Sequence, residues 1–358
     1  MADPRGTIIV TGANGGLGTA IVSQIISAPD LNASYHGIYI ARNVATAKSL
    51  DTAIVNQVSR SATPHSHEKI SLDLSNLSDV RTVAGTINRR VAEGMVPRIH
   101  AIVLNAGYEE FEKQTWTEDG LDTSFATNYL GHWLLSMLLL QSIDADRGRV
   151  LWICSWSHNP HDPRNSWNGA FKEAKYNIVL NSNNIDAIAR GQWSLSKDDM
   201  TGWAAGYRRY GASKLCGVVA ISELQRRLDQ DSALNNVSVL GIDPGLVNTG
   251  IVRQSGSWVL RVFLWQLLLP ALRVILGCFI SNGPLRSARK SASDIIAAAL
   301  MSSPPPLSAR PKALYLNGSE LGIRNPEALD PAKGSMLWRD TIRYTQLESQ
   351  ETCLEHWC

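Results

Sequence analysis

Short, strongly apolar runs alternate with longer stretches of helical periodicity along most of this 358-residue chain. The runs are too short for buried helices, so they indicate buried strands; they cover residues 7–10, 38–40, 70–72, 99–104, 150–154, 237–242 and 313–316. Helices fit between them, for example over 121–141 and 203–228. Because strands that alternate with helices pair in parallel, the pattern predicts an α/β fold with a doubly wound parallel sheet.

Size and composition are consistent with one domain over residues 1–358, since 44% of the residues are apolar and 18% are charged. Two regions depart from a minimal α/β domain: a polar, tryptophan-bearing insertion at 156–202 and an apolar segment at 250–290. Both follow the carboxyl ends of predicted strands, where ligands bind in such sheets. We therefore expect them to form an enlarged lid over a substrate.

The formal net charge is +2, which does not favour nucleic acid as a partner. Five scattered cysteines show no metal-ligand spacing, so we predict no metal site and a reducing compartment. Residues 1–6 lack the apolar core of a signal peptide. Together these features predict a cytoplasmic protein.

Residues 258–280, WVLRVFLWQLLLPALRVILGCFI, are long and apolar enough to span a bilayer. Arg261 and Arg273 would each cost about 2.5–3.5 kcal/mol at mid-bilayer on insertion scales, and Pro270 would kink the helix. We favour a segment that covers the substrate pocket. Peripheral contact with an intracellular membrane is the main alternative, and a true span is the least favoured.

A glycine-rich turn, Thr11 to Gly18, follows the first predicted strand and opens a helix. Glycine allows the tight turn and lets backbone N–H groups approach a phosphate. An ordinary strand–helix turn is the alternative, but the position at the first strand–helix junction favours a dinucleotide site of the Rossmann type. The residues that we assign to cofactor binding here are Gly12, Asn14, Gly16, Leu17 and Gly18.

Arg42 ends the second strand, where a site for NAD usually has an acid that holds the ribose 2′-hydroxyl. A guanidinium suits a 2′-phosphate, so the sequence predicts that NADP(H) is preferred over NAD(H). A solvated surface arginine is the alternative. Asp73 follows the third strand and either contacts adenine or caps a helix. Asn105, after the fourth strand, is placed where the backbone passes close to the cofactor.

Tyr210 and Lys214 are spaced i and i+4, so they share one face of a predicted helix. There the ammonium can lower the phenol's pKa until the phenol exchanges a proton near neutral pH. Tyr207 has Gly211 at the equivalent spacing, so only Tyr210 has a lysine partner. Surface packing is the alternative, but a nearby dinucleotide that carries hydride favours a nicotinamide oxidoreductase.

In order along residues 6–250, the glycine turn is followed by Asn105-Ala106-Gly107, Asn128, Ser155, Tyr210 with Lys214, and Pro244-Gly245. This order resembles the short-chain dehydrogenase/reductase superfamily. The Ala-Arg-Asn strand end, the long gap before the tyrosine, and residues 337–339 are most similar to the retinol-dehydrogenase, protochlorophyllide-reductase and 3-ketosteroid-reductase-like branch. The chain also resembles ketoreductases of fungal terpenoid and polyketide pathways.

The resemblance implies a role for each matching residue. Tyr210 would exchange a proton with the substrate oxygen, Lys214 would hold the nicotinamide ribose, and Ser155 would fix the carbonyl, with Ser157 as its competitor. Asn128 would hold a water that links Lys214 to solvent, or it is only a polar helix residue.

The resemblance also implies that Pro244, Gly245 and Thr249 form a segment that contacts the nicotinamide carboxamide. About 55 residues separate Ser155 from Tyr210, more than in small family members. Aromatic residues of this insertion either line a pocket for a bulky substrate or pack it onto the domain; they are Trp156, Trp167, Trp193 and Trp203. His158 is expected to assist binding or to be solvated.

The leading hypothesis is an NADPH-dependent enzyme that interconverts a ketone and a secondary alcohol on a bulky, hydrophobic substrate, such as a steroid, terpenoid or polyketide of secondary metabolism. A redox-neutral epimerase or isomerase with the same residues is one alternative. A non-catalytic nucleotide-binding scaffold is another. The long helix that carries Tyr210 is compatible with a homodimer, and a monomer is equally compatible.

Overall fold

Parallel strands form the centre of the computed structural model, which describes residues 6–58, 64–110, 113–181, 184–247 and 282–358. The order of the eight-stranded sheet is β10-β9-β6-β5-β4-β1-β2-β3. Its strands are β1 (Gly6–Val10), β2 (Tyr35–Ala41), β3 (His67–Ser71), β4 (Ile99–Leu104), β5 (Arg149–Ile153), β6 (Ser238–Asp243), β9 (Leu314–Asn317) and β10 (Glu320–Leu321). All pairs are parallel except β9 with β10.

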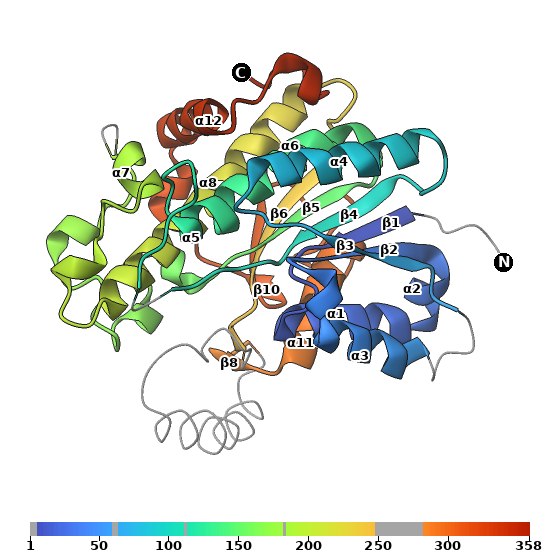
Figure 1. Cartoon of the computed structure of the whole chain (residues 1–358), viewed down its shortest axis with the longest axis horizontal. Coiled ribbons are helices and arrows are strands. Elements are labelled where there is room, and N and C mark those ends of the chain that lie inside the picture. Colours follow the sequence, from blue (N-terminus) through green and yellow to red (C-terminus); the bar gives the residue numbers. More distant parts are fainter. Residues whose placement is uncertain (1–5, 59–63, 111–112, 182–183, 248–281) are drawn as a thin grey trace.

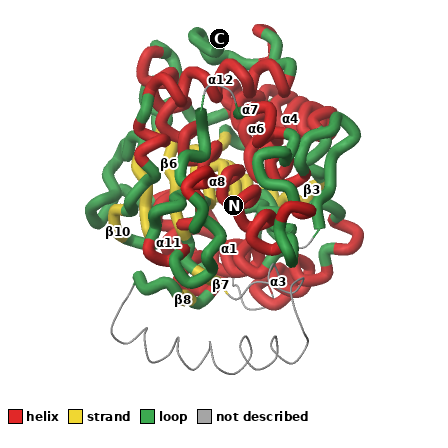
Figure 2. The backbone as a smooth tube through the Cα atoms, turned by 90° about the vertical axis from the view of Figure 1, so that its left-hand side faces the viewer, coloured by secondary structure: helices red, strands yellow, loops and turns green. Residues whose placement is uncertain are grey.

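Each inner strand is buried on both faces, as the apolar runs predict. In β1, Ile9 packs into one apolar cluster, while Ile8 and Val10 pack into the other. This alternation follows from the two-residue period of a strand, which directs neighbouring side chains to opposite faces. The sheet therefore requires helices on both sides (Figure 2).

Two helix layers supply that cover. One layer packs against the cluster that contains Ile9 and is formed by α4 (Leu77–Ala92), α6 (Gly131–Leu139), α8 (Trp203–Gln230) and α12 (Pro331–Thr345). The other packs against the cluster that contains Ile8 and is formed by α1 (Gly16–Ser27), α3 (Lys48–Val58) and α11 (Ala288–Leu300). The predicted doubly wound, Rossmann-type α/β sheet is confirmed.

The strand order reverses between β1 and β4. The chain runs outward from β1 through β2 to β3, then returns to β4 on the other side of β1 and continues to β5 and β6. At such a switch point the two connecting segments leave in opposite directions, which opens a crevice at the carboxyl ends of the strands. The glycine turn and the segment after β4 both start at this place.

Some elements differ from the predictions. The expected helix over 121–141 begins only at Thr123, with the short helix α5 (Thr123–Phe125), and then widens into a π-helical turn (Ala126–Leu130) before α6. The antiparallel edge strand β10, the short helix α2 (Pro29–Ser34), and the small parallel pair β7 (Leu246–Val247) and β8 (Leu285–Arg286) were not predicted. These elements are too short to show a periodic pattern.

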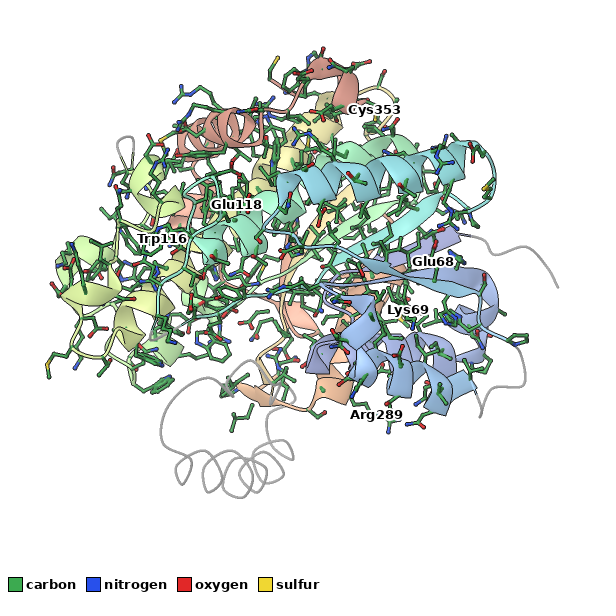
Figure 3. All side chains as sticks on the ribbon, viewed as in Figure 1. Glu68, Lys69, Trp116, Glu118, Arg289 and Cys353 are labelled. Atoms are coloured by element: carbon green, nitrogen blue, oxygen red, sulfur yellow. The ribbon has the colours of Figure 1, made fainter. Side chains whose placement is uncertain are left out.

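The insertion at 156–202 packs against the amino-terminal half of α8 and contains the short helix α7 (Ile185–Ala189). Phe171, Tyr176 and Tyr207 form a small apolar cluster there. The loop after β4, which carries Trp116 (labelled in Figure 3), is tied to the insertion as well. The indole N–H of Trp116 donates to the carbonyl of Arg190 at 2.9 Å.

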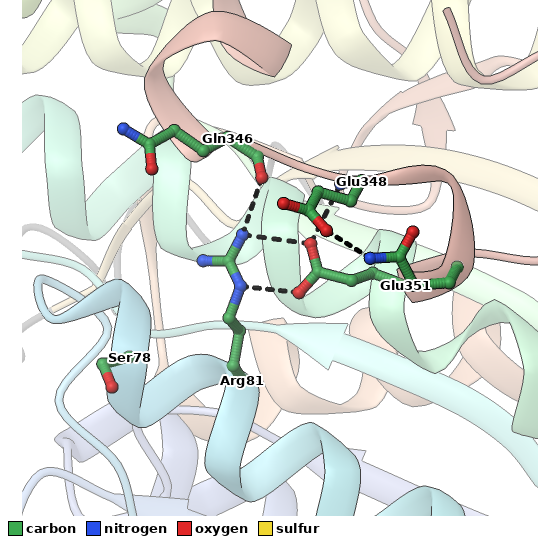
Figure 4. A pocket seen from close by; sticks show the side chains of 6 residues that line it. Ser78, Arg81, Gln346, Glu348 and Glu351 are labelled. Carbon is green, nitrogen blue, oxygen red and sulfur yellow. Dashed lines mark hydrogen bonds and ion pairs between the residues drawn. The ribbon is translucent and has the colours of Figure 1, made fainter.

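The carboxyl-terminal segment is tied to α4 (Figure 4). The guanidinium of Arg81 donates to both carboxylate oxygens of Glu351, at 2.6 and 3.2 Å, and to the carbonyl of Gln346 at 3.3 Å. These residues line a polar hollow far along the chain from the glycine turn. Because the guanidinium is already paired, the hollow is a structural junction rather than an anion site.

The apolar segment 258–280 lies outside the described residues, as does most of the predicted lid segment 250–290. Within the part of the chain that the structure describes, no helix combines the length and the apolar character needed to cross a bilayer.

Candidate active site

The glycine turn after β1 is shaped by contacts that only glycine permits. Gly12 has φ of +63°, and a Cβ there would lie 2.7 Å from the Cα of Ala106. A Cβ on Gly18 would lie 2.2 Å from the carbonyl oxygen of Gly12. A side chain at either position would therefore push the turn away from β4 or push α1 away from the turn.

The amino terminus of α1 is open to a ligand. Its N-cap residue Gly15 makes no side-chain hydrogen bond, the first turn contains no acid, and Gly15 and Gly16 are exposed. The first N–H groups of a helix lack partners within the helix and carry partial positive charge. This arrangement fits the pyrophosphate of a dinucleotide.

Two residues that were predicted to bind the cofactor also support the turn, and their contact with the cofactor stays a prediction. The carboxamide oxygen of Asn14 accepts a hydrogen bond from the backbone N–H of Leu50 at 3.0 Å, which ties the turn to α3. The side chain of Leu17 is buried in the core between α1 and the sheet. Both residues hold the turn in place from its protein side.

Asn105 locks the end of β4 to the glycine turn. Its side chain donates to the carbonyl of Thr11 at 2.9 Å and to that of Gly12 at 3.3 Å. The Thr11 hydroxyl accepts from the backbone N–H of Asn105 and of Ala106, at 2.9 and 3.0 Å, and contacts Nε2 of buried His132 at 3.0 Å. Thr11 and His132 were not predicted, because their partners are about 90 to 120 residues away.

Arg42 extends from the end of β2 and is exposed. Its Nε lies 3.9 Å from an Asp73 carboxylate oxygen, and its guanidinium carbon lies 5.9 Å from the ring centre of Tyr108. The other Asp73 oxygen accepts from the N–H and the hydroxyl of Ser75. The N-cap of α4 is Asn76, so the capping alternative for Asp73 is wrong.

Asn128 lies in the π-helical turn between α5 and α6. Its side chain binds both the loop after β4 and helix α8. Its oxygen accepts from the N–H of Tyr108 at 2.7 Å; its amide donates to the carbonyl of Tyr108 at 2.8 Å and to the Ser213 hydroxyl at 3.0 Å. Single π-helical turns inside α-helices are found frequently at functional sites. Asn128 thus fixes the loop after β4 against α8, while its predicted role in holding water stays a prediction.

Ser155, Tyr210 and Lys214 come together beside the carboxyl end of β5. The Ser155 hydroxyl lies near enough to the phenol of Tyr210 to act against the rise of its pKa. The Lys214 ammonium donates to the carbonyl of Ile153, the last residue of β5, at 2.9 Å, and lies 5.6 Å from the ring centre of Tyr210. Ser157 donates to the Ser155 hydroxyl at 3.0 Å. Ser155 is therefore the serine beside the phenol, with Ser157 behind it.

The expected lowering of the phenol's pKa by Lys214 is wrong for this structure. Burial raises the pKa of Tyr210 well above its ordinary value, and the negative charge of Glu109 raises it further. Ser155 acts in the opposite direction but is outweighed. Burial also lowers the pKa of Lys214. Tyr210 is thus a protonated phenol at neutral pH, which is the form that donates a proton in a reduction.

Glu109 is a site residue that the sequence analysis missed. It follows Tyr108 on the loop after β4, and burial raises the pKa of its carboxyl to about 8, while Lys214 acts in the opposite direction. A carboxyl with such a pKa beside a tyrosine and a lysine marks a candidate functional group. No pattern in the sequence identifies it, because Glu109 and Glu110 are equivalent there.

Pro244 and Gly245 follow β6. Pro244 is bonded by a residue of α11, and Gly245 lies against Arg286, just before that helix. Gly245 has φ of +76°, and the carbonyl of Pro244 accepts from the Ser291 hydroxyl at 2.7 Å. The preceding residue, Asp243, is buried and pairs with Arg164 of the insertion at 3.0 Å. Thr249 lies outside the described residues, so its predicted contact stays a prediction.

His158 supports the serine rather than contacting solvent. It is 1% exposed, and burial lowers the pKa of its imidazole. Nε2 accepts from the backbone N–H of Asn325 at 3.1 Å, which leaves Nδ1 to donate to the carbonyl of Ser155 at 2.7 Å. The expectation of a solvated loop histidine is wrong, because the insertion and the carboxyl-terminal segment enclose it.

Tryptophans of the insertion divide between packing and exposure. Trp203 stacks on Tyr207 with ring centres 5.2 Å apart, Trp193 packs against Tyr176, and Trp156 is buried. Trp167 is 74% exposed. Three of the four thus favour the packing alternative that the sequence left open.

Together these features define a class of protein. A glycine turn at the switch point of a parallel sheet fits a dinucleotide, and the phenol, hydroxyl and ammonium beside it can exchange a proton with a bound substrate. This is the arrangement of a dinucleotide-dependent oxidoreductase of the α/β class.

Comparison with known proteins identifies the family. The model of the short chain dehydrogenase family matches residues 6–178. The short-chain dehydrogenase iccH from Talaromyces variabilis is 38% identical over 367 aligned positions, which cover 99% of each chain. This chain therefore belongs to the short-chain dehydrogenase family, whose members use a nicotinamide cofactor, and the resemblance seen in the sequence is confirmed.

Solved structures agree on the fold. The promiscuous reductase LugOII, which catalyses keto-reduction at C1 during lugdunomycin biosynthesis, matches with a TM-score of 0.55 and 13% identity, over 89% of this chain and 99% of that one. The angucycline C-6 ketoreductase LanV, with bound NADP, matches with a TM-score of 0.53 and 16% identity. The match covers 89% of this chain and 97% of LanV.

Proposed function

We propose that this protein is an NADPH-dependent reductase that converts a ketone into a secondary alcohol on a bulky, hydrophobic substrate of secondary metabolism, and that the same site supports the reverse oxidation. The observation that carries the proposal is the convergence of the Ser155 hydroxyl, the protonated phenol of Tyr210 and the Lys214 ammonium beside the carboxyl end of β5. A ketone oxygen that accepts from both hydroxyls would be fixed and polarised in one contact.

When bound, the nicotinamide supplies the hydride for the carbonyl carbon. Tyr210 donates its proton to the carbonyl oxygen, and Ser155 holds that oxygen in place. Lys214 brings a positive charge close to the phenolate that results, which stabilises it. Gly12, Gly16 and Gly18 would receive the pyrophosphate at the amino terminus of α1.

Arg42 supports a preference for the 2′-phosphate. Its guanidinium is 63% exposed at the end of β2, with only a long contact to Asp73, so it is free to pair with a phosphate. The solved neighbour LanV contains NADP. The preference is proposed for this chain on the charge at this one position.

The substrate class rests on the size of the insertion and on two biosynthetic relatives of the fold. The insertion at residues 156–202 reaches the carboxyl end of β6, where its Arg164 pairs with Asp243 and lies over the ring of Trp156. LugOII catalyses a keto-reduction during lugdunomycin biosynthesis, and LanV is an angucycline C-6 ketoreductase. A bulky ketone is therefore our proposed substrate.

The test uses the purified protein with NADPH and a panel of aromatic, polycyclic and isoprenoid ketones, followed by loss of the reduced cofactor's absorbance. We expect turnover that falls by about 10²–10⁴ in Tyr210→Phe, because general acid catalysis contributes that much. Tyr207→Phe is the matched control on the same helix. Product formation without cofactor consumption would indicate a redox-neutral reaction instead.

Cofactor preference is tested by Arg42→Asp. A lost charge-assisted contact of about 1.5–3 kcal/mol corresponds to roughly 10–100-fold weaker NADPH binding. NADH affinity should be unchanged or improved. Equal NADPH affinity in the variant and the unchanged protein would remove Arg42 from the proposal.

We also propose a cytoplasmic location in which residues 258–280 cover the substrate pocket, with peripheral membrane contact as the main alternative, on the basis of their composition alone. Flotation with liposomes tests this contact. Protein that stays at the bottom of the gradient with and without anionic lipid would contradict it.

A further inference from the structure

A buried histidine lies between the glycine turn and the segment that carries Asn128. It is His132, the second residue of α6, and its side chain is 1% exposed. Its two ring nitrogens reach different parts of the site. Nε2 lies 3.0 Å from the Thr11 hydroxyl, and Nδ1 lies 3.3 Å from the backbone carbonyl oxygen of Asn128. Proton and hydride transfer as derived above use neither nitrogen, so the position of this imidazole needs another explanation.

The two partners determine which ring nitrogen carries the proton. A backbone carbonyl only accepts hydrogen bonds, so Nδ1 is the donor to Asn128. Nε2 of the neutral ring is then an acceptor, and the Thr11 hydroxyl donates to it. Burial lowers the pKa of His132 to about 3, and the charge of Lys214 acts in the same direction. The ring is therefore neutral at physiological pH, as this pattern of donors and acceptors requires.

The Thr11 hydroxyl is satisfied by the same assignment. Its single proton points to His132 at 3.0 Å rather than to the carbonyl of Val103 at 3.4 Å. Its oxygen accepts from the backbone N–H groups of Asn105 and Ala106, at 2.9 and 3.0 Å. The side chain of Asn105 binds the carbonyl of Thr11 in return, at 2.9 Å. Nε2 of His132 is thus bonded to the point where the glycine turn meets the end of β4.

On its other side, the imidazole bonds the π-helical turn. The carbonyl that accepts from Nδ1 belongs to Asn128, whose side chain donates to the Ser213 hydroxyl at 3.0 Å. Ser213 precedes Lys214 in α8, and its hydroxyl donates to the carbonyl of Tyr210 at 2.7 Å. A shift of the Asn128 backbone would therefore disturb contacts with the helix that carries the phenol and the ammonium.

Packing keeps the imidazole in this orientation. Its ring meets the indole of Trp152 in β5 edge to face, with centres 5.9 Å apart and an angle of 80° between the planes. If the ring of His132 turned, both of its hydrogen bonds would break in the protein interior. Polar groups left without partners there cost free energy, so one orientation is strongly preferred.

We propose that His132 is a positioning residue, which holds the Asn128 turn against the glycine turn and so keeps the reaction centre in place relative to the bound dinucleotide. Its effect on turnover rests on the proposed function. The hydrogen bonds run from the amides of residues 105 and 106 through the Thr11 hydroxyl and the imidazole to the carbonyl of Asn128. Every donor keeps its proton, so the imidazole transmits position and not charge.

Two substitutions in the full chain separate the two contacts. His132→Asn keeps a donor near the position of Nδ1 and loses the acceptor that faces Thr11. NADPH binding, followed by fluorescence titration, should weaken by about 5–100-fold, the range expected when a buried hydrogen-bonding group loses its partner.

His132→Gln keeps an acceptor near the position of Nε2 and loses the donor to Asn128. It should bind NADPH within about twofold of the unchanged protein, because the contact with Thr11 is retained. For ketone reduction, kcat should fall by about 5–100-fold and KM should change by less than about twofold, because the transition-state geometry is disturbed and ground-state binding is not.

His65→Gln and His65→Asn are the matched controls. His65 is also buried and bonded through both ring nitrogens, to Tyr39 at 2.7 Å and to Asn32 at 2.9 Å. It precedes β3, so it lies at the amino edge of the parallel sheet, opposite the site. Both controls should lower stability in urea unfolding and leave NADPH affinity and kcat unchanged. If the His132 variants behaved in the same way, the histidine would be structural only and the inference would be wrong.

The tautomer of His132 gives a readout that does not depend on turnover. Heteronuclear NMR of protein labelled in its histidine rings distinguishes the two nitrogens, and the resonance that disappears in His132→Gln identifies this ring. We expect a proton on Nδ1 and none on Nε2 between about pH 5 and 8. A proton on Nε2 would overturn the inference, because the Thr11 hydroxyl could not donate to it. Absence of ketone reduction in the unchanged protein would contradict only the proposed function, since NADPH affinity and the tautomer still test His132.

Discussion

The glycine turn and the insertion beside α8 are built in different ways. Around the turn, backbone groups, glycines and neutral side chains make the contacts, as between Asn105 and the carbonyl of Thr11. Around the insertion, buried charges do so: Arg209 pairs with Asp122 at 3.2 Å, with both side chains 4% exposed, and Arg164 pairs with Asp243. The cofactor half therefore depends on local shape, whereas the substrate half depends on long-range pairing of charge.

The largest effect should come from breaking the buried pair. Arg209→Met removes the charge that faces Asp122 and the donors that bind the carbonyls of Ser194 and Lys113. Loss of one partner of a buried pair typically costs about 3–5 kcal/mol, because the other charge stays buried. Urea unfolding measures this loss.

The control for that prediction is Arg343→Met, at an exposed pair with Asp186 whose side chains are 52% and 62% exposed. Exposed pairs contribute roughly 0.2–1 kcal/mol. Similar small losses in both variants would mean that buried charge does not hold the insertion side together.

A smaller effect is expected in the glycine turn. Gly18→Ala adds a Cβ that meets the carbonyl oxygen of Gly12 at 2.2 Å, so α1 or the turn must shift. Overpacking of this kind costs about 1–3 kcal/mol, and we expect NADPH affinity to fall by the same free energy or more. Thermal unfolding and fluorescence titration measure the two effects.

Gly85→Ala provides the matched glycine. It lies inside α4, where no atom lies within 4 Å of the added Cβ, so the change should stabilise the protein by about 0.5–1 kcal/mol. If Gly18→Ala also stabilised the protein and left cofactor binding intact, the shape argument for the turn would be wrong.

The smallest effect concerns how the free energy of unfolding depends on pH, through His65 beside β2. Burial lowers the pKa of His65 to about 4, and its imidazole contacts the Tyr39 hydroxyl at 2.7 Å. The unfolded chain takes up a proton near pH 6.5 and the folded chain does not, so stability falls as pH drops from about 6.5 towards 4. His65 should contribute roughly 1.4 kcal/mol per pH unit to that slope, and His132 and His158, whose pKa values burial also lowers, contribute in the same direction.

His65→Gln should reduce that slope by the His65 contribution, because the amide does not titrate. Urea unfolding at pH 7 and pH 5.5 measures the difference between the two proteins. An identical slope in the variant would show that the acid sensitivity arises elsewhere, for example among the buried charges beside the insertion.

The same contrast explains what the sequence could predict. The strands, the glycine turn and the Tyr210–Lys214 spacing are local patterns, so the sheet and the position of these side chains followed from them. Glu109, His158 and Arg164 were missed or misjudged because their partners lie far along the chain. The pKa of Tyr210 was predicted in the wrong direction because burial is a property of the assembled fold.

The hydrogen bonds of His158 have a consequence for how this enzyme tolerates change in length. A protein that ended before residue 325 would keep every side chain assigned to proton transfer. It would lack the backbone N–H of Asn325, which holds the His158 imidazole against the carbonyl of Ser155. The last tenth of the chain thus supports the reaction centre, although no side chain in it is assigned to proton transfer.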